Sequence, residues 1–197
     1  MPISAIHDVK GGPFAQYDQI IEALGEHAQS PGGLAHIATA TPHGFLVCDI
    51  WESQEDFENF LPQLLPRAEA AGLAPQTAPK LGRVEKLIVS DDANTLPAVA
   101  VLYSFAGMTV AQNYDLLASV NADGPPPITR RAHIASETAD GIFVLGVWES
   151  EPAFHDFEPV IQRAFAACGV AGAAPVIGQI HRLAFIPGAG LHQPAHA

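Results

Sequence analysis

The sequence predicts an α+β protein made of two tandem ferredoxin-like repeats. Each repeat has the element order βαββαβ, and the two pack sheet to sheet as an intrachain pseudo-dimeric α+β barrel. Three observations support this prediction. The segment GFLVCDIWES at 44–53 returns as GIFVLGVWES at 141–150. Strand-like and helix-like apolar patterns follow in the same order in each copy. The segment 45–51 is apolar on both faces, as is typical of a strand covered on both sides.

A nearly constant offset in residue number relates the two copies. An offset of 97 aligns identical residues without a gap over most of each copy: Tyr17 with Tyr114, His36 with His133, and Trp51 with Trp148. Further on one residue is lost, and an offset of 96 aligns Gly82 with Gly178. This pattern predicts a tandem duplication with repeats at 1–92 and 97–187, a joint near 90–97, and a flexible tail at 188–197.

Each expected element has a local reason. The apolar run at 3–9 suits a strand, and the apolar residues of 14–24 have helical spacing. The segment 34–51 is typical of two strands joined by a tight turn at 42–44. Ser53 is a good N-cap for a helix whose apolar residues fall on one face. Pro62 and Pro66 are expected to kink or split that helix. Strands at 81–89 and 177–185 close the two copies.

Composition limits the possible partners and location. With 9 Lys+Arg against 21 Asp+Glu, the net charge of −12 argues against nucleic acid or an anionic membrane surface as a partner. No apolar run is long enough to cross a membrane, and no signal peptide is visible, so we expect a cytoplasmic protein. A further homodimer of the pseudo-dimer is possible.

Several segments resemble a known family. GMTVAQNYD at 107–115, AHIA at 132–135 and GIFVLGVWES at 141–150 are similar to the dimeric α+β barrel superfamily, in particular its antibiotic-biosynthesis-monooxygenase-like (ABM-like) group. The resemblance covers both copies and implies a fused member of the group. It implies a cofactor-independent monooxygenase whose partner is a small aromatic or polyketide-type substrate, or a cyclase, isomerase or lyase of the same fold. Haem-degrading relatives carry a histidine where this chain has Ala70 and Ala167, so no cofactor is expected.

His36 is the first candidate catalytic residue. If the turn at 42–44 is tight, cross-strand partners place His36 opposite Asp49, with Trp51 one step along the same face. A carboxylate beside a histidine fixes its tautomer and suits a general base. A buried polar pair without catalytic function is the alternative. In the second copy His133 remains but Gly146 replaces Asp49, which opens space there. Either the copies have diverged, or neither histidine is catalytic.

Other side chains are candidates for substrate binding. Tyr17 and Tyr114 are expected on the inward face of the first helix of each copy, and Trp51 and Trp148 could form walls around an aromatic ring. For all four, core packing is the alternative. Under the offset of 97, Tyr103 replaces Ile6 and Ser104 replaces His7, so the first strands differ in polarity between the copies.

Charged and metal-binding candidates are fewer. Arg131, beside Arg130, could bind a substrate carboxylate at a cavity mouth, and a solvated strand entry is the alternative. His192 and His196 lie in the tail without neighbouring ligands, so no metal site is expected.

Two functions remain open. In the first, His36 supported by Asp49 deprotonates an electron-rich aromatic so that the resulting anion reduces dioxygen. The same proton transfer could also begin a cyclisation, isomerisation or decarboxylation. In the second, the barrel binds a small molecule without catalysis.

Overall fold

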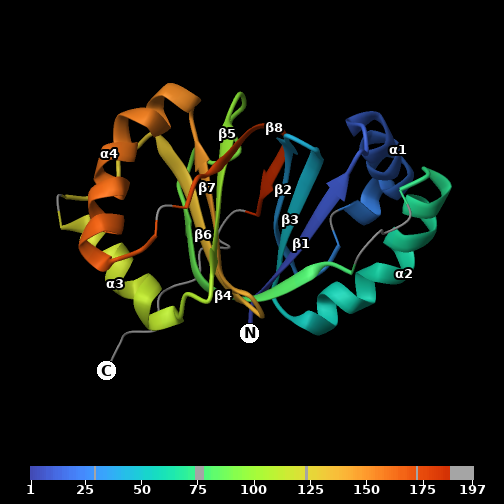
Figure 1. The fold of residues 1–197 in the computed structure, drawn as a ribbon. Helices are drawn as coiled ribbons and strands as arrows, with labels where there is room; N and C mark the ends of the chain where they lie inside the picture. Colours follow the sequence, from blue (N-terminus) through green and yellow to red (C-terminus); the bar gives the residue numbers. More distant parts are fainter. Residues whose placement is uncertain (29, 74–77, 123, 172, 187–197) are drawn as a thin grey trace.

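The computed structural model describes residues 1–28, 30–73, 78–122, 124–171 and 173–186 (Figure 1). The predicted flexible tail, with His192 and His196, lies outside the described residues. The N-terminal half contains β1 (Ile3–Lys10), α1 (Phe14–Leu24), the 3-10 helix η1 (Gly25–Ala28), β2 (Gly33–Thr41), β3 (Gly44–Trp51), α2 (Gln54–Ala70) and β4 (Lys80–Val89). The C-terminal half contains β5 (Val99–Ala106), α3 (Val110–Asn121), β6 (Arg130–Thr138), β7 (Gly141–Trp148), α4 (Glu151–Cys168) and β8 (Val176–Phe185). The predicted order βαββαβ is confirmed in both halves.

The strands form one closed barrel in the order β1-β3-β2-β8-β5-β7-β6-β4. Within each half the order is that of a ferredoxin-like sheet. The two sheets are joined edge to edge by the antiparallel pairs β2–β8 and β4–β6. Helices α1 and α2 cover the outside of one sheet, and α3 and α4 cover the outside of the other (Figure 1). The predicted pseudo-dimeric α+β barrel within one chain is confirmed.

The two faces of each sheet bury different cores. The barrel interior is apolar and is built from both halves, with Ile37, Cys48 and Ile50 from one half against Ile134 and Leu145 from the other, all 0% exposed. The outer faces pack against the helices in separate clusters, one around Phe45 and another around Phe154. Because successive strand residues point to opposite faces, the apolar character of both faces follows directly from this double burial.

Local capping explains where the second helix of each half begins. The Ser53 hydroxyl accepts a hydrogen bond from the backbone N–H of Asp56 at the start of α2, and Ser150 does the same for Ala153 at the start of α4. Helix α2 continues through Pro62 and Pro66, so the expected split does not occur. Both prolines are exposed, which leaves the interrupted backbone hydrogen bonds on the side of the helix that faces solvent.

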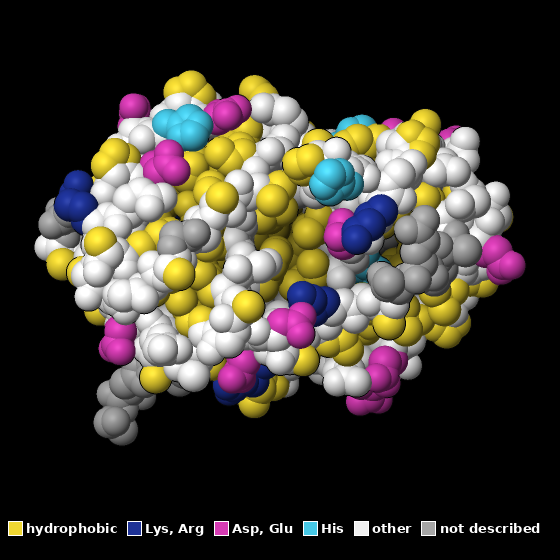
Figure 2. Space-filling model, in the orientation of Figure 1, with side chains coloured by type: hydrophobic (Ala, Val, Ile, Leu, Met, Phe, Trp, Pro, Cys, Tyr) yellow, Lys and Arg dark blue, Asp and Glu magenta, His cyan; other side chains and the backbone are white. Residues whose placement is uncertain are grey.

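The surface carries no broad basic area on the face shown. Figure 2 shows lysine and arginine side chains scattered among acidic ones, over both halves. The expectation that nucleic acid is not a partner stays a prediction. Within the part of the chain that the structure describes, no helix is long and apolar enough to cross a bilayer.

Candidate functional site

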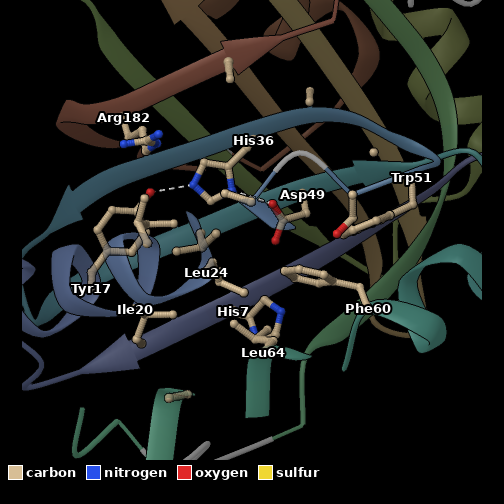
Figure 3. A pocket seen from close by; sticks show the side chains of 18 of the residues that line it. His7, Tyr17, Ile20, Leu24, His36, Asp49, Trp51, Phe60, Leu64 and Arg182 are labelled. Carbon is tan, nitrogen blue, oxygen red and sulfur yellow. Dashed lines mark hydrogen bonds and ion pairs between the residues drawn. The ribbon is translucent and has the colours of Figure 1, made fainter. Parts of the chain in front are cut away.

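A cavity of about 600 Å³ lies in the N-terminal half, between the outer face of the sheet and helices α1 and α2. Its volume falls within the range typical of small-molecule sites. Most of its lining is apolar, with Ile20 and Leu24 from α1, Phe45 from β3, and Phe60 and Leu64 from α2. Its polar side chains are concentrated on the strands, where they lie close to one another (Figure 3).

The polar centre of the cavity is a chain of three side chains. The Tyr17 hydroxyl lies 2.6 Å from Nε2 of His36, and Nδ1 of His36 lies 2.6 Å from Oδ1 of Asp49 (Figure 3). The β2–β3 register pairs His36 with Asp49, so the predicted juxtaposition is confirmed. An ionised carboxylate only accepts hydrogen bonds, so Nδ1 carries the proton. When the ring is neutral, Nε2 accepts a hydrogen bond from the Tyr17 hydroxyl.

Burial and nearby charges set the protonation of the cavity. Burial raises the pKa of Tyr17 above its usual value, while the positive charge of Arg182 opposes this rise. Tyr17 therefore stays a neutral donor at physiological pH. Burial lowers the pKa of His7, with Asp49 opposing and His36 adding to that shift, so His7 stays neutral beside the pair.

Trp51 forms one wall of the cavity. It lies two residues after Asp49 on β3, so both side chains are on the same face of the sheet, as predicted. Its ring centroid lies 5.2 Å from that of Phe60 and 6.0 Å from that of Phe57. In Figure 3, Trp51 and Phe60 lie at one end of the cavity, while Tyr17 and Arg182 lie at the other. An aromatic ligand between these ends would meet ring faces on one side and the polar chain on the other.

The C-terminal half has a much smaller cavity at the equivalent position. Its volume is about 70 Å³, and its lining includes His133, Arg130, Tyr103 and Trp148. His133 is 6% exposed, and its Nε2 has no hydrogen-bond partner among the described residues. Burial, together with the positive charges of Arg130 and Lys86, lowers the pKa of His133 to about 3. This histidine is neutral at physiological pH, and no carboxylate among the described residues pairs with it.

The strand register shows which residues are equivalent in the two halves. Strand β1 pairs Ile3 with Trp51, and β5 pairs Val99 with Trp148. The first strands are therefore offset by 96 and not by 97, and the predicted replacement of Ile6 by Tyr103 is wrong. Tyr103 instead occupies the position of His7, on the face that packs against the helices.

The first helices follow the same offset of 96. The buried residues are Tyr17, Ile20 and Leu24 in α1, and Asn113, Leu116 and Val120 in α3. Asn113 is thus the counterpart of Tyr17. The predicted equivalence of Tyr17 with Tyr114 is wrong, and Tyr114 is not among the residues that line the second cavity. The extra residue of the C-terminal half falls between its first helix and its second strand.

Larger side chains fill the second cavity. Arg130 faces Trp148 across the strands, as Gly33 faces Trp51, so an arginine stands where the first half has a glycine. Tyr103 stacks on Phe105 with ring centroids 5.5 Å apart. The expected open space at Gly146 is absent, because a Cβ there would lie 2.8 Å from Nε1 of Trp148. The Trp148 indole occupies that space.

Comparisons with known proteins agree with this architecture. No family model and no curated protein sequence matches the chain. A crystal structure of a candidate monooxygenase from Fusobacterium nucleatum matches with a TM-score of 0.68 at 10% identity, covering 96% of both chains. A candidate monooxygenase from Lactobacillus acidophilus matches with a TM-score of 0.63 at 11% identity, covering 93% of this chain and 96% of that chain. An anthrone oxidase-like protein matches with a TM-score of 0.55 at 16% identity, covering 95% and 94%.

The chain has the same α+β barrel fold as these structures. At these identities the comparisons establish the fold, and they confirm the predicted resemblance at that level. The fold places a small-molecule cavity between sheet and helices, but the reaction and the substrate have to be argued from the residues that line it.

Arg131 has a structural position in the barrel and does not line the cavity. It is 8% exposed, and its Nη1 donates to the backbone carbonyls of Thr95 and Pro97 at 2.7 and 3.1 Å. Its Nε lies 3.4 Å from a carboxylate oxygen of Asp92. Arg131 therefore holds the segment that joins the two halves, and neither the predicted substrate carboxylate nor the solvated strand entry describes it.

Sequence reasoning missed two polar residues of the cavity. His7 was aligned with Ser104 under the wrong offset, which hid its position on the cavity face. Arg182 lies on β8, in the other half, and enters the cavity because β8 pairs with β2 of the N-terminal half. Nothing local in the sequence around Arg182 indicates this pairing.

Proposed function

We propose that the N-terminal cavity binds an aromatic small molecule with an acidic C–H or O–H group and starts its cofactor-independent oxidation by removing that proton. The observation that supports this proposal is the chain Tyr17–His36–Asp49 in an otherwise apolar cavity. A neutral histidine oriented by a carboxylate is an effective general base near neutral pH. Asp49 stabilises the imidazolium that forms when His36 takes up a proton.

Tyr17 connects the base to the ligand. Its hydroxyl accepts the substrate proton while its own proton passes to Nε2 of His36, so no tyrosinate accumulates. The raised pKa of Tyr17 is compatible with such a transfer, because the phenol stays protonated before and after the step. Alternatively, the ligand displaces Tyr17 and donates to His36 directly.

The overall reaction balances without a redox cofactor. The substrate carbanion transfers electrons to dioxygen, and a C–O bond forms to give a peroxide anion. This anion takes back the proton held by His36, which gives the hydroperoxide and restores the base. Loss of water then leaves a carbonyl group. A methylene compound and one dioxygen thus give a ketone and one water, with the carbon oxidised and oxygen reduced. The names of the structural neighbours, monooxygenases and an anthrone oxidase-like protein, favour this class over cyclisation, isomerisation or lyase chemistry.

A second candidate function is ligand binding without catalysis. The observation that favours it is that both ring nitrogens of His36 already have partners within the protein. If these hydrogen bonds persist when a ligand is bound, the histidine positions Tyr17 as a donor and transfers no proton.

The test compares His36→Ala with His133→Gln, which changes the equivalent histidine in the filled cavity. Anthrone serves as the probe, with oxygen uptake as the rate measurement and calorimetry under nitrogen as the binding measurement. We expect His36→Ala to lower kcat by about a hundredfold or more with Kd little changed, since general base catalysis contributes about 10²–10⁴-fold. His133→Gln should keep the wild-type rate. Unchanged oxygen uptake in His36→Ala, or no uptake by the wild type, would contradict the proposal.

A further inference from the structure

The mouth of the N-terminal cavity carries an arginine from the other half of the chain. Arg182 lies on β8 and pairs with Ala38 of β2, two residues along the strand from His36. Its guanidinium therefore lies on the cavity face of the barrel, close enough to Tyr17 to affect the phenol electrostatically. Figure 3 shows it at the end of the cavity opposite Trp51.

The charge of Arg182 is not neutralised within the described part of the chain. It forms no hydrogen bond or ion pair there, while the acidic residues around it have other partners. Asp49 binds His36, and Asp18 lies 2.7 Å from His181. Among the described residues, Glu26 is the acid other than Asp49 in the cavity lining, and it forms no ion pair with Arg182. In a chain with a net charge of −12, an arginine without an ion-pair partner at a cavity mouth is a specific feature.

We propose that the ligand of this cavity is an aromatic carboxylate, whose ring lies between Trp51 and the His36 chain and whose carboxylate binds Arg182 at the mouth. The proposal deepens the proposed function and rests on it for the aromatic character of the ligand. Arg182 is exposed, so the carboxylate keeps contact with water on one side and needs only partial desolvation. A guanidinium binds a carboxylate through two parallel hydrogen bonds, which also fixes the orientation of the ring.

The second half supplies a matched control. Lys86 pairs with Ala135 on β6 as Arg182 pairs with Ala38 on β2, so the two cations occupy equivalent positions. Lys86 lies close enough to His133 for its positive charge to lower the pKa of that histidine, and it does not line the N-terminal cavity.

The experiment uses the full-length protein and two probes that differ in charge, 6-hydroxy-2-naphthoate and its uncharged carboxamide. Binding is measured by calorimetry under nitrogen at low and high salt. We expect the wild type to bind the acid at least about tenfold more tightly than the amide, which is the effect of one charge-assisted hydrogen bond. Arg182→Gln should remove this preference, so that the acid and the amide bind with affinities within about twofold of each other. Arg182→Lys should retain part of it, and Lys86→Gln all of it. High salt should reduce the preference in the wild type.

Equal binding of both probes by the wild type, a preference that survives in Arg182→Gln, or binding of neither probe would overturn the inference. Because binding is measured without oxygen, its outcome is separate from turnover. An acid preference that depends on Arg182, in a protein that consumes no oxygen, supports this inference and contradicts the proposed function. Oxygen uptake without a preference for the acid supports the proposed function and contradicts this inference.

Discussion

His36 and His133 occupy equivalent positions on β2 and β6 but have opposite surroundings. His36 has hydrogen bonds to Tyr17 and Asp49 and lines an open cavity. His133 is buried between cationic side chains, and its pKa falls to about 3. Arg130, which contributes to this shift, has its own pKa lowered by burial to about 10 and is still charged at neutral pH. The same residue type is therefore a candidate base in one half and a neutral core residue in the other.

The buried His133 should make stability depend on pH. In the unfolded chain this histidine titrates near 6.5, whereas the folded protein keeps it neutral until about pH 3. Below pH 6.5 the unfolded state therefore binds the extra proton, and acidification favours unfolding. We expect His133 to reduce the free energy of unfolding by about 2 kcal/mol between pH 7.5 and pH 5. Urea unfolding of the wild type and His133→Gln at both pH values measures this difference.

His155→Gln is the control for this measurement. His155 is exposed on α4, and hydrogen bonds to Glu158 and Glu151 raise its pKa, so its contribution has the opposite sign and is lost as the pH rises. Parallel pH dependence in the wild type and His133→Gln would show that His133 titrates normally in the folded state.

At the scale of elements, the first residues of β2 and β6 differ in size in the same sense as the two cavities differ in volume. Gly33 and Arg130 both face a tryptophan across the strands, and the missing side chain of Gly33 leaves the cavity beside Trp51 open. A Cβ at Gly33 would lie 3.7 Å from the Trp51 ring and 3.2 Å from the Ser30 carbonyl oxygen. A methyl group is therefore tolerated there with a small adjustment, whereas a long side chain has to enter the cavity.

Gly33→Arg should close the N-terminal cavity. We expect the variant to fold and its affinity for 6-hydroxy-2-naphthoate to fall by at least about tenfold. The new side chain occupies the space of the ligand ring, so the ring can no longer be buried in the cavity. Gly33→Ala should retain binding within a fewfold. Calorimetry measures both, and circular dichroism checks the fold. Wild-type affinity in Gly33→Arg would place the ligand elsewhere.

A second element-scale feature is the contact between α1 and β8. His181 of β8 stacks on Phe14 of α1, with ring centroids 4.0 Å apart, and pairs with Asp18. The C-terminal half thus fixes the helix that carries Tyr17 and also supplies Arg182. The N-terminal cavity is complete only when both halves are present.

For the whole molecule, the barrel interior is a single core built from both halves. Strand pairs β2–β8 and β4–β6 continue the hydrogen-bonded ladder across the two joints. Unfolding one half alone would expose the inner face and both sheet edges of the other half. Exposing that apolar face costs far more free energy than breaking the strand pairs at the two joints. We therefore propose that the repeats at 1–92 and 97–187 unfold as one cooperative unit.

The chain has two tryptophans, one in each half, which allows a direct test of this cooperativity. Trp148→Phe leaves Trp51 as the reporter of the N-terminal half, and Trp51→Phe leaves Trp148 as the reporter of the C-terminal half. In each variant we expect urea unfolding followed by fluorescence to coincide with unfolding followed by circular dichroism. Midpoints that differ between the two probes within one variant would show that the halves unfold separately.

Much of the fold could be predicted from local patterns. The duplicated segment around Trp51 and Trp148 indicated two equal units, and the apolar character of both strand faces indicated that each sheet needs a second covering layer. The pairing of His36 with Asp49 followed from a tight turn, because turn length fixes the register of a hairpin. The offset in β1 and α1 was predicted incorrectly, because one residue inserted between elements changes no local pattern while it moves every side chain to a new counterpart.

The sequence by itself determined the duplication, the element order and the His36–Asp49 pair, since each depends on residues close together along the chain. Only the tertiary structure decided that the two halves differ in cavity size, that Arg131 binds the joint, and that Arg182 reaches the N-terminal cavity. These features depend on side-chain volumes and on the pairing of β2 with β8, strands more than a hundred residues apart. Such pairings are set by closure of the barrel as a whole, which no short segment encodes.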